Sequence, residues 1–274
     1  MAKYKVNFFS KYLLRAFFYR DFSITSAVVS FCLIFFEHFQ QKTELGIGAF
    51  VGLVLDYIYK WNQANKVKKV AVTLNDSLIE ICEGDVFKQE GFKVIAFNEY
   101  FDTKVDNNII SSKTLNGEYI KKHVKNVRQL DIDIKKKLKD KKIGVRSERR
   151  DGKKDVYKLG TIFKHNKFLL VAFSHFDESN KAYLSMTDYV SCLIEMWNEI
   201  DKYYNGTNVA LPIMGSGITR FKGKKLSEQE LLEILLWSFK LSDFKLAQTA
   251  KIQIVAKSEI IDKIDLYKIQ QEFD

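Results

Sequence analysis

The chain has 274 residues, a formal net charge of +10 and 46% hydrophobic residues. This apolar content excludes a disordered chain, and the length allows one or two domains with a full core. Its three cysteines, Cys32, Cys82 and Cys192, are odd in number and widely spaced. They therefore argue against a disulfide framework or a zinc site and fit a reducing cytosol.

Two uncharged runs open the chain, Phe22–Phe36 and Leu45–Leu55. With its flanks, each becomes a helix of about 17–20 residues, just long enough to cross the hydrocarbon layer of a membrane. The second run carries small residues on one side, a pattern that lets membrane helices pack closely: Gly46, Gly48, Ala49 and Gly52. An aromatic cluster suited to the membrane interface follows: Tyr57, Tyr59 and Trp61. We therefore predict a two-helix transmembrane region within residues 1–65.

A signal peptide and a buried soluble hairpin are the alternatives for these runs. No small-residue cleavage site follows the first run, and a second apolar run comes at once, which disfavours a signal peptide. Both runs are apolar on all sides instead of along one stripe, which disfavours a soluble hairpin.

Lysines and arginines predict the orientation of the hairpin. Basic residues precede the first run and follow the second, whereas the connecting loop, Glu37 to Glu44, holds one lysine and two acids. By the positive-inside rule, both termini lie in the cytoplasm and the loop lies outside, as in a multi-pass protein of the inner (cell) membrane. The basic, aromatic and amphipathic stretch Lys5–Arg20 is expected on the inner leaflet.

From about Val70 the sequence changes to strands alternating with helices, which predicts a cytoplasmic domain over residues 66–274. The pattern favours an α/β/α fold with a mixed, mostly parallel central sheet. The expected strands are Ser77–Cys82, Lys93–Asn98, Val156–Phe163, Phe168–Ser174, Thr207–Ile213 and Lys251–Ala256. The expected helices are Leu115–Lys139, Ser185–Tyr204, Ser227–Leu241 and a closing helix.

The segment Lys135–Lys154 is dense in lysine and arginine. Nucleic acid or an anionic lipid leaflet would suit this charge, and so would a solvated helix end with a hairpin loop, which we favour. Because no aromatic platform, RNP motif or zinc-finger spacing accompanies the charge, we expect no nucleic-acid partner.

Polar loops follow three of the expected strands. Gly84-Asp85-Val86 comes after the first, Asn98 and residues 111–117 follow the second, and Pro212 precedes the glycine loop at residues 215–219. Glycine lets the backbone approach a ligand, and free N–H groups at helix entries bind anions. Since ligands of α/β sheets bind at the carboxyl ends of strands, two such loops facing one crevice predict a diphosphate site. A plain strand-to-helix turn is the alternative for the glycine loop.

Other chemistries find less support in the sequence. Gly223-Lys224 is followed by Lys225 and lacks the preceding glycine of a P-loop, and no GxGxxG follows the first strand. No Ser-His-Asp set or close carboxylate pair is evident, and none of the four histidines has metal-ligand spacing. His123 and His175 could approach the crevice, but we favour ordinary surface or core positions for both. We therefore expect no catalytic residue, no metal and no cofactor.

Four segments carry a resemblance to a known family: GDV after the first strand, VIAFNEYFDT, SSKTLNGEYI and VALPIMGSGI. Their order resembles a macro domain, and more narrowly the macro domain of the membrane-anchored ThsA proteins of Thoeris anti-phage systems. The similarity extends from about Leu74 to the C-terminus, and the double span before it matches that family's architecture. The resemblance implies recognition of an ADP-ribose-type nucleotide.

The resemblance also implies the ligand contacts. Asp85, beside Val86, matches the aspartate that accepts a hydrogen bond from the adenine amino group, and Asn98 matches the asparagine near the distal ribose. A helix cap for Asp85 and a turn for Asn98 are the alternatives. The two phosphate loops correspond to Thr114, Leu115, Asn116 and Gly117, and to Gly215, Ser216, Gly217, Ile218 and Thr219.

The first phosphate loop departs from the general family, because SSKTLNGE replaces the glycine-rich run of hydrolytic macro domains. We therefore expect binding without turnover. In the resembled systems a TIR-domain partner consumes NAD and makes the ligand, an ADP-ribose derivative such as a histidine conjugate. The resemblance implies an anti-phage effector in which this ligand drives homo-oligomerisation and disruption of the lipid bilayer. A membrane-anchored ADP-ribosyl hydrolase and a membrane tether that uses the basic surface remain alternatives.

Overall fold

The computed structural model describes residues 5–35, 42–247 and 249–273. Contacts divide the chain into two compact units. The first unit joins Met1–Val70 to Asp262–Asp274, and the second is Ala71–Ile261. The C-terminal segment is thus grouped with the N-terminal helices, although it follows the second unit in the chain.

The first unit is helical. It contains α1 (Lys11–Ala16), a π-helical segment (Phe17–Phe22), α2 (Ser23–Phe35), α3 (Lys42–Lys66) and α9 (Leu266–Phe273). Both α2 and α9 contact α3. The Tyr12 hydroxyl donates a hydrogen bond of 3.1 Å to Glu272 Oε2, which ties the C-terminal helix to the N-terminal segment.

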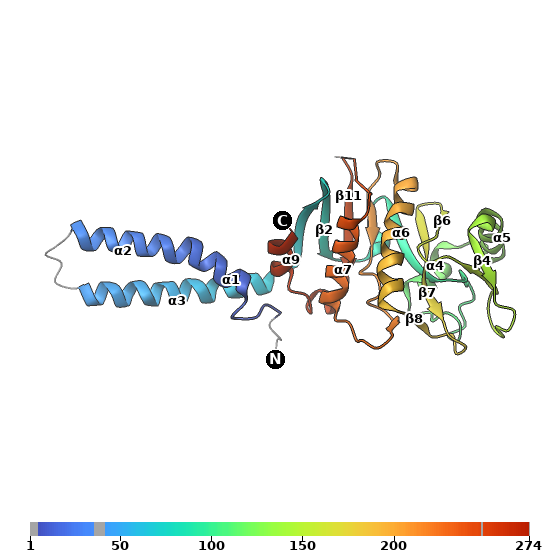
Figure 1. Ribbon diagram of the computed structural model, residues 1–274, viewed down its shortest axis with the longest axis horizontal. Coiled ribbons are helices and arrows are strands. Elements are labelled where there is room, and N and C mark those ends of the chain that lie inside the picture. Colours follow the sequence, from blue (N-terminus) through green and yellow to red (C-terminus); the bar gives the residue numbers. More distant parts are fainter. Residues whose placement is uncertain (1–4, 36–41, 248, 274) are drawn as a thin grey trace. The chain divides into compact units, whose positions relative to one another are not determined.

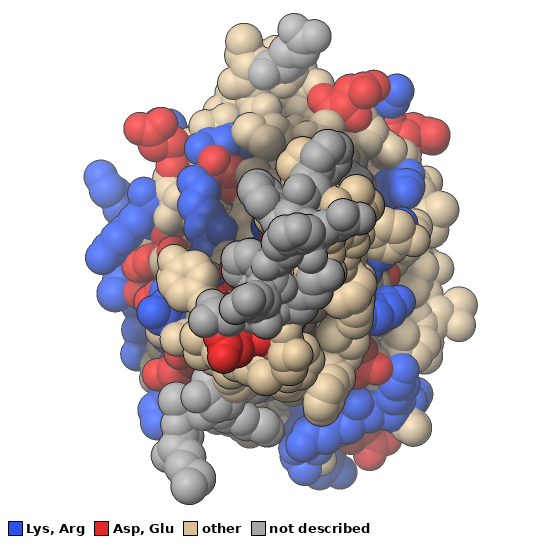
Figure 2. Space-filling view, turned by 90° about the vertical axis from the view of Figure 1, so that its left-hand side faces the viewer, with Lys and Arg blue, Asp and Glu red and all other residues tan. Residues whose placement is uncertain are grey.

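Apolar side chains on α2 and α3 point outward instead of into a core. Ile24, Phe31 and Phe50 are 61%, 58% and 68% exposed. In Figure 2 both uncharged and acidic residues lie next to the central grey atoms. Among the described residues, one helix, Lys11–Ile34, is long and apolar enough to cross a membrane by length and composition alone. The second predicted span is not confirmed, and most of the predicted loop at residues 37–44 lies outside the described residues.

The glycines of α3 do not pack against other described parts of the chain. A Cβ atom added to Gly46, Gly48 or Gly52 meets no described atom within 4 Å. The π-helical segment contacts α3 through an ion pair, in which Lys60 Nζ lies 2.5 Å from Asp21 Oδ2.

The start of the amphipathic stretch is held by α3. The Val6 N–H donates to Asn65 Oδ1 at 2.9 Å, and the Trp61 indole N–H donates to the Val6 carbonyl at 2.9 Å. The Phe8 ring meets the rings of Tyr57 and Trp61 edge to face at 5.1 Å. Protein contacts therefore fix this segment, and its position at a leaflet stays a prediction.

The second unit is built on a mixed sheet of nine strands among the described residues, in the order β1-β2-β11-β9-β3-β7-β8-β10 with β6 paired to β7. The strands β2, β11, β9, β3 and β7 are parallel, whereas β6 and β8 run antiparallel to β7. The predicted mixed, mostly parallel sheet is confirmed. The bounds are β1 Lys69–Leu74, β2 Ser77–Glu83, β3 Phe92–Asn98, β6 Ile162–His165, β7 Phe168–Phe176, β8 Ala182–Leu184, β9 Val209–Leu211, β10 Arg220–Phe221 and β11 Lys251–Ala256.

Helices cover both faces of this sheet. On one face α6 (Met186–Tyr204) and α7 (Glu228–Leu241) lie side by side (Figure 1). On the other face Tyr119 of α4 (Leu115–His123) and Ile134 of α5 (Val127–Lys137) share a buried cluster with Ile95 of β3. Burial on both faces explains why the central strands are nearly continuous apolar runs.

Two predicted elements were wrong in extent. The predicted helix Leu115–Lys139 is broken into α4 and α5, because Asn126 caps the second helix by accepting from the Gln129 N–H at 3.0 Å. The predicted strand Val156–Phe163 is also divided. Its first part lies in β5 (Asp155–Tyr157), which pairs with β4 (Lys142–Val145), and its last part lies in β6, which pairs with β7.

Candidate functional site

One cavity lies at the carboxyl ends of the parallel strands. Its volume of about 520 Å³ falls within the range of small-molecule sites. Gly84 follows β2, Asn98 ends β3, Pro212 follows β9 and Ala256 ends β11, and all four line the cavity. Because these strands are parallel, their ends meet at one edge and bring distant loops together. Every predicted ligand-binding residue except Gly117 lines this cavity.

Asp85 lies in the wall of the cavity at the start of a short 3-10 helix, Val86–Lys88. Its Oδ1 accepts a hydrogen bond of 2.9 Å from the Phe87 N–H, so the carboxylate caps this helix. A helix cap was the alternative role considered for Asp85 in the sequence. No described donor lies on Oδ2. One carboxylate oxygen therefore fixes the side chain, and the other can accept a hydrogen bond from a ligand.

The Asn98 amide is held inside the protein. Its Oδ1 accepts from the N–H groups of Tyr100 and Asp102, both at 3.1 Å. These bonds are typical of a turn, which was the alternative role considered for Asn98 in the sequence. Its Nδ2 donates to Asp102 Oδ2 at 2.8 Å. An amide nitrogen carries two protons, so one donor remains for a ligand in the cavity.

The first predicted phosphate loop ends at the N-terminus of α4. Thr114 is the N-cap, and its hydroxyl oxygen accepts from the Gly117 N–H at 3.3 Å. Gly117 itself is buried, and a Cβ there would lie 2.2 Å from the Ser111 carbonyl oxygen. Gly117 thus supports the loop, and the N–H groups of Leu115 and Asn116, in the first turn of the helix, are the ones left without an intrahelical acceptor.

The second predicted phosphate loop has a fixed base and an open tip. The Ser216 N–H donates to the Ile213 carbonyl at 3.2 Å, and Gly215 has a φ of +89°, as the third residue of a type II turn requires. The buried Tyr189 hydroxyl donates to the Met214 carbonyl at 2.8 Å, and burial raises the pKa of that phenol. Beyond this base the N–H groups of Gly217 and Ile218 find no acceptor among the described residues.

Two lysines that sequence reasoning missed complete the electrostatics of the cavity. Lys113 precedes the cap of α4, Lys257 follows β11, and both line the cavity. Neither forms an ion pair with a described acid. In the sequence, only their positions next to the ends of a predicted helix and strand could have indicated that these lysines belong to the site. Free N–H groups, a helix N-terminus and two unpaired lysines together favour a ligand with more than one negative charge.

The two histidines that were expected to be ordinary residues do not line the cavity. His123 stacks on Phe87 with ring centres 5.0 Å apart. His175 Nδ1 lies 2.7 Å from Oε2 of the buried Glu99. Among the described residues, no group of three or more His, Cys, Asp or Glu side chains could hold a metal ion.

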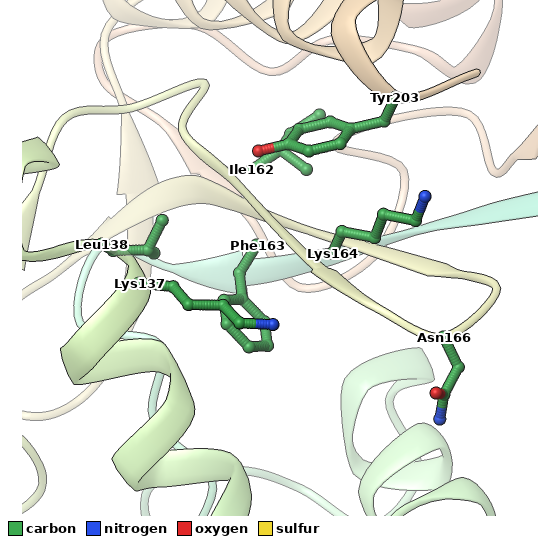
Figure 3. A pocket seen from close by; sticks show the side chains of 7 residues that line it. All are labelled: Lys137, Leu138, Ile162, Phe163, Lys164, Asn166 and Tyr203. Atoms are coloured by element: carbon green, nitrogen blue, oxygen red, sulfur yellow. The ribbon is translucent and has the colours of Figure 1, made fainter. Parts of the chain in front are cut away.

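A second cavity, of about 340 Å³, lies near the amino end of β7 and holds no predicted site residue. Figure 3 shows Tyr203 above Ile162, and Lys137 in front of Phe163. Lys137 belongs to the last turn of α5, where its positive charge offsets the partial negative charge of the helix end. Its ammonium group also lies 5.7 Å from the centre of the Phe163 ring. Local structure thus accounts for this lysine, and we assign the cavity no ligand.

Comparison with known proteins gives a family and several relatives. The family described as "Thoeris protein ThsA, Macro domain" matches residues 79–257. The Thoeris protein ThsA of Bacillus amyloliquefaciens (strain Y2) is 41% identical over 214 residues, which cover 75% of this chain and 71% of that protein.

Solved structures of a macrodomain from Oceanobacillus iheyensis also match. A mutant of that macrodomain with ADPR has a TM-score of 0.48 at 11% identity, over 75% of this chain and 97% of the other. The same macrodomain with ADP has a TM-score of 0.45 at 12% identity, over 75% of this chain and 95% of the other.

Proposed function

The chain belongs to the macro-domain family of the Thoeris protein ThsA, and from this premise we propose that it is an anti-phage effector whose cavity binds an ADP-ribose-type nucleotide. The observation that carries the proposal is the position of the expected residues. Loops that are far apart in the sequence, from Asp85 to Thr219, line one cavity of nucleotide size at the carboxyl edge of the sheet.

The chemistry of the cavity suits each part of such a ligand. Asp85 Oδ2 is an acceptor for the exocyclic amine of adenine. The free N–H groups of the two loops, with Lys113 and Lys257, suit a diphosphate. Asn98 retains one amide proton for an acceptor on the distal ribose. No cofactor is required for this binding role.

The proposed role is binding without turnover. The first loop lacks the glycine-rich run of hydrolytic macro domains. The amide oxygen of Asn98 already accepts two backbone N–H groups, so it is not free to accept a hydrogen bond from an attacking water. In this proposal the ligand, an ADP-ribose derivative such as a histidine conjugate, is supplied by a TIR-domain partner that consumes NAD.

Ligand binding is proposed to act on the N-terminal helices at the inner membrane. The exposed apolar side chains of α2 and α3 suit lipid, and we propose that both helices span the bilayer with cytoplasmic termini. Gly46, Gly48 and Gly52 face open space, so a helix of another copy can approach them closely. Because two helices cannot enclose an aqueous path, any pore requires several copies of the chain, and we propose that a homo-oligomer disrupts the membrane.

The C-terminal segment offers a covalent route between cavity and helices. Lys257 and Ile260 line the cavity, and the chain then continues into α9, which contacts α3. Ligand that displaces Ile260 would pull on α8 (Ser258–Ile261) and so on α9. A ligand can shift the helices from one arrangement to another only if it binds the two arrangements with different affinities. In this proposal the C-terminal segment links ligand binding in the cavity to the arrangement of the helices.

Calorimetric titration of the full chain in detergent with ADP-ribose tests the binding step. We expect saturable binding that is weakened at least about tenfold in Asp85→Ala and retained in Asp201→Ala, an exposed acid on α6 outside the cavity. Chromatography after a long incubation with an ADP-ribosyl conjugate should recover the conjugate intact. Absence of binding by ADP-ribose and by the products of a TIR-domain enzyme would contradict the proposal, and release of free ADP-ribose from the conjugate would favour a hydrolase.

A further inference from the structure

The basic segment Lys135–Lys154 is not wholly a solvated surface. Arg149 lies within it, yet only 6% of its side chain is exposed. Its guanidinium group lies over the ring of Tyr100, 3.9 Å from the ring centre. This burial needs an explanation, because a guanidinium group leaves water only where charge and hydrogen bonds compensate it.

Asp102 provides that compensation. Arg149 Nη2 lies 2.7 Å from Asp102 Oδ2, and the Asp102 side chain is 2% exposed. The Lys153 N–H donates to Asp102 Oδ1 at 2.7 Å, and Arg149 Nη1 donates to the Lys153 carbonyl at 2.6 Å. Arg149 Nη2 also donates to Asn180 Oδ1 at 2.9 Å. The loop that carries the charge run thus closes around one buried carboxylate.

Gly152 allows this approach of the loop. Its φ is +87°, and a Cβ at this position would lie 2.7 Å from Asp102 Oδ1 and 2.8 Å from Arg149 Nη1. A side chain there would displace the ion pair. Within the basic sequence RRDGKK, Gly152 is therefore required by the local structure of the loop.

The same carboxylate also holds the cavity residue Asn98. Asp102 Oδ2 accepts from Asn98 Nδ2 at 2.8 Å as well as from Arg149. Backbone N–H groups on Asn98 Oδ1 and a carboxylate on Asn98 Nδ2 leave only one orientation of the amide that satisfies both. In that orientation the second proton of Nδ2 is the donor left for the cavity.

We propose that Asp102 and Arg149 are positioning residues that fix the Asn98 amide as a hydrogen-bond donor to the distal ribose of the ligand. This inference rests on the proposed function. Neither side chain lines the cavity, so both act only through Asn98. Without Arg149, the buried carboxylate of Asp102 loses its direct ion-pair partner among the described residues, and its hold on the amide weakens. Arginine is required because one flat fork contacts Asp102, Lys153 and Asn180 at once.

The test compares ADP-ribose with ADP, which lacks the distal ribose. Calorimetry on the full chain in detergent should show that Arg149→Lys weakens ADP-ribose binding about tenfold, the worth of one well-placed hydrogen bond, while ADP affinity is unchanged. Arg150→Lys is the matched control, because Arg150 is the exposed neighbour in the same loop. Equal weakening of both ligands, or no change in either, would overturn the inference.

A double-mutant cycle separates positioning from general support of the fold. In an Asn98→Ala background, Arg149→Lys should have no further effect on ADP-ribose affinity, because its effect passes through the amide. A further loss of the same size would contradict the inference. If Arg149→Lys lowers the melting temperature too far for titration, Asp102→Asn keeps the shape of the side chain and should show the same selective loss.

The two proposals fail in different ways. If the proposed function is wrong, the unaltered chain binds neither ADP-ribose nor ADP, and this inference falls with it. If only the inference is wrong, both ligands bind and Asp85→Ala weakens both, but Arg149→Lys does not distinguish them.

Discussion

The two units of the chain use the same kinds of side chain in opposite ways. In the α/β unit Trp197, Phe173 and Phe239 are at most 1% exposed and lie between sheet and helices. In the helical unit Ile24, Phe31 and Phe50 are more than half exposed. Burial of apolar side chains away from water is favourable in free energy, and their exposure to water is unfavourable. The α/β unit thus encloses its own apolar core, whereas the helical unit leaves apolar side chains exposed, which suits the proposed insertion into lipid.

The largest difference is expected in folding stability. Trp197→Ala should lower the free energy of unfolding by about 3–5 kcal/mol, because the buried indole also donates to Ser238 Oγ. Phe31→Ala should change it by less than about 0.5 kcal/mol. Urea titration in detergent, followed by tryptophan fluorescence or circular dichroism, measures both. Equal costs would mean that Phe31 lies in a protein core.

A charge in the second helix sharpens the comparison at the membrane. Phe50→Lys should oppose insertion by about 2.5–3.5 kcal/mol if α3 spans the hydrocarbon layer. Fractionation should then show part of the protein leaving the membrane pellet, while Phe50→Leu stays in it. If Phe50→Lys behaves like Phe50→Leu, α3 does not span the bilayer.

Within the α/β unit, the cavity is the region that we propose to bind a ligand. Asp85→Ala should weaken ADP-ribose binding about tenfold to a hundredfold, because a carboxylate acceptor is removed from a partly buried wall. Binding of AMP should fall by the same factor, since Asp85 is assigned to adenine. Calorimetry with both ligands checks this, and selective loss of ADP-ribose alone would place Asp85 at the wrong end of the site.

A smaller effect is expected at Lys257. Lys257→Ala should weaken ADP-ribose about threefold to tenfold and reduce the dependence of affinity on salt, because an exposed ammonium group acts on the diphosphate through a screened charge. Lys136→Ala, in the basic segment outside the cavity, should change neither quantity. Titrations at low and high salt decide the matter, and an unchanged salt dependence would remove Lys257 from the site.

The smallest effect is a dependence of stability on pH. Burial lowers the pKa of His165 from 6.5, and Tyr119 Oη lies 2.6 Å from its Nδ1. Below pH 6.5 the unfolded chain binds this proton before the folded chain does, so stability falls as pH decreases from 6.5 toward the lowered value. Urea midpoints at about pH 5 and about pH 7 should differ less in His165→Gln than in the unaltered chain. An identical difference in both would exclude this histidine as a source.

The sequence predicted what depends on local pattern. The strands, the helices that begin near Ser185 and Ser227 and the loops around the cavity all follow from residues close together in the chain. It did not predict the break at Asn126 inside a mostly polar segment, because the break depends on a capping bond that competes with the helix. It also missed the burial of Arg149, since the partner that neutralises it, Asp102, is far away in the chain and belongs to another motif.

For the site, the sequence indicated which loops meet, but it did not indicate which side chains face the cavity and which support the loops. Gly117 was predicted as a ligand contact and lies instead beneath the loop, where the Ser111 carbonyl leaves no room for a side chain. Lys113 and Lys257 were missed because a single lysine beside a loop resembles any surface lysine until the fold places it.

The most direct test of the account measures whether the cavity controls the helices. The full chain is reconstituted into dye-filled vesicles with anionic lipid, and the nucleotide products of a TIR-domain enzyme acting on NAD are added. The account predicts dye release that requires the nucleotide, that is lost in Asp85→Ala and that is retained in Asp201→Ala. Release without nucleotide, or equal release by Asp85→Ala, would contradict it.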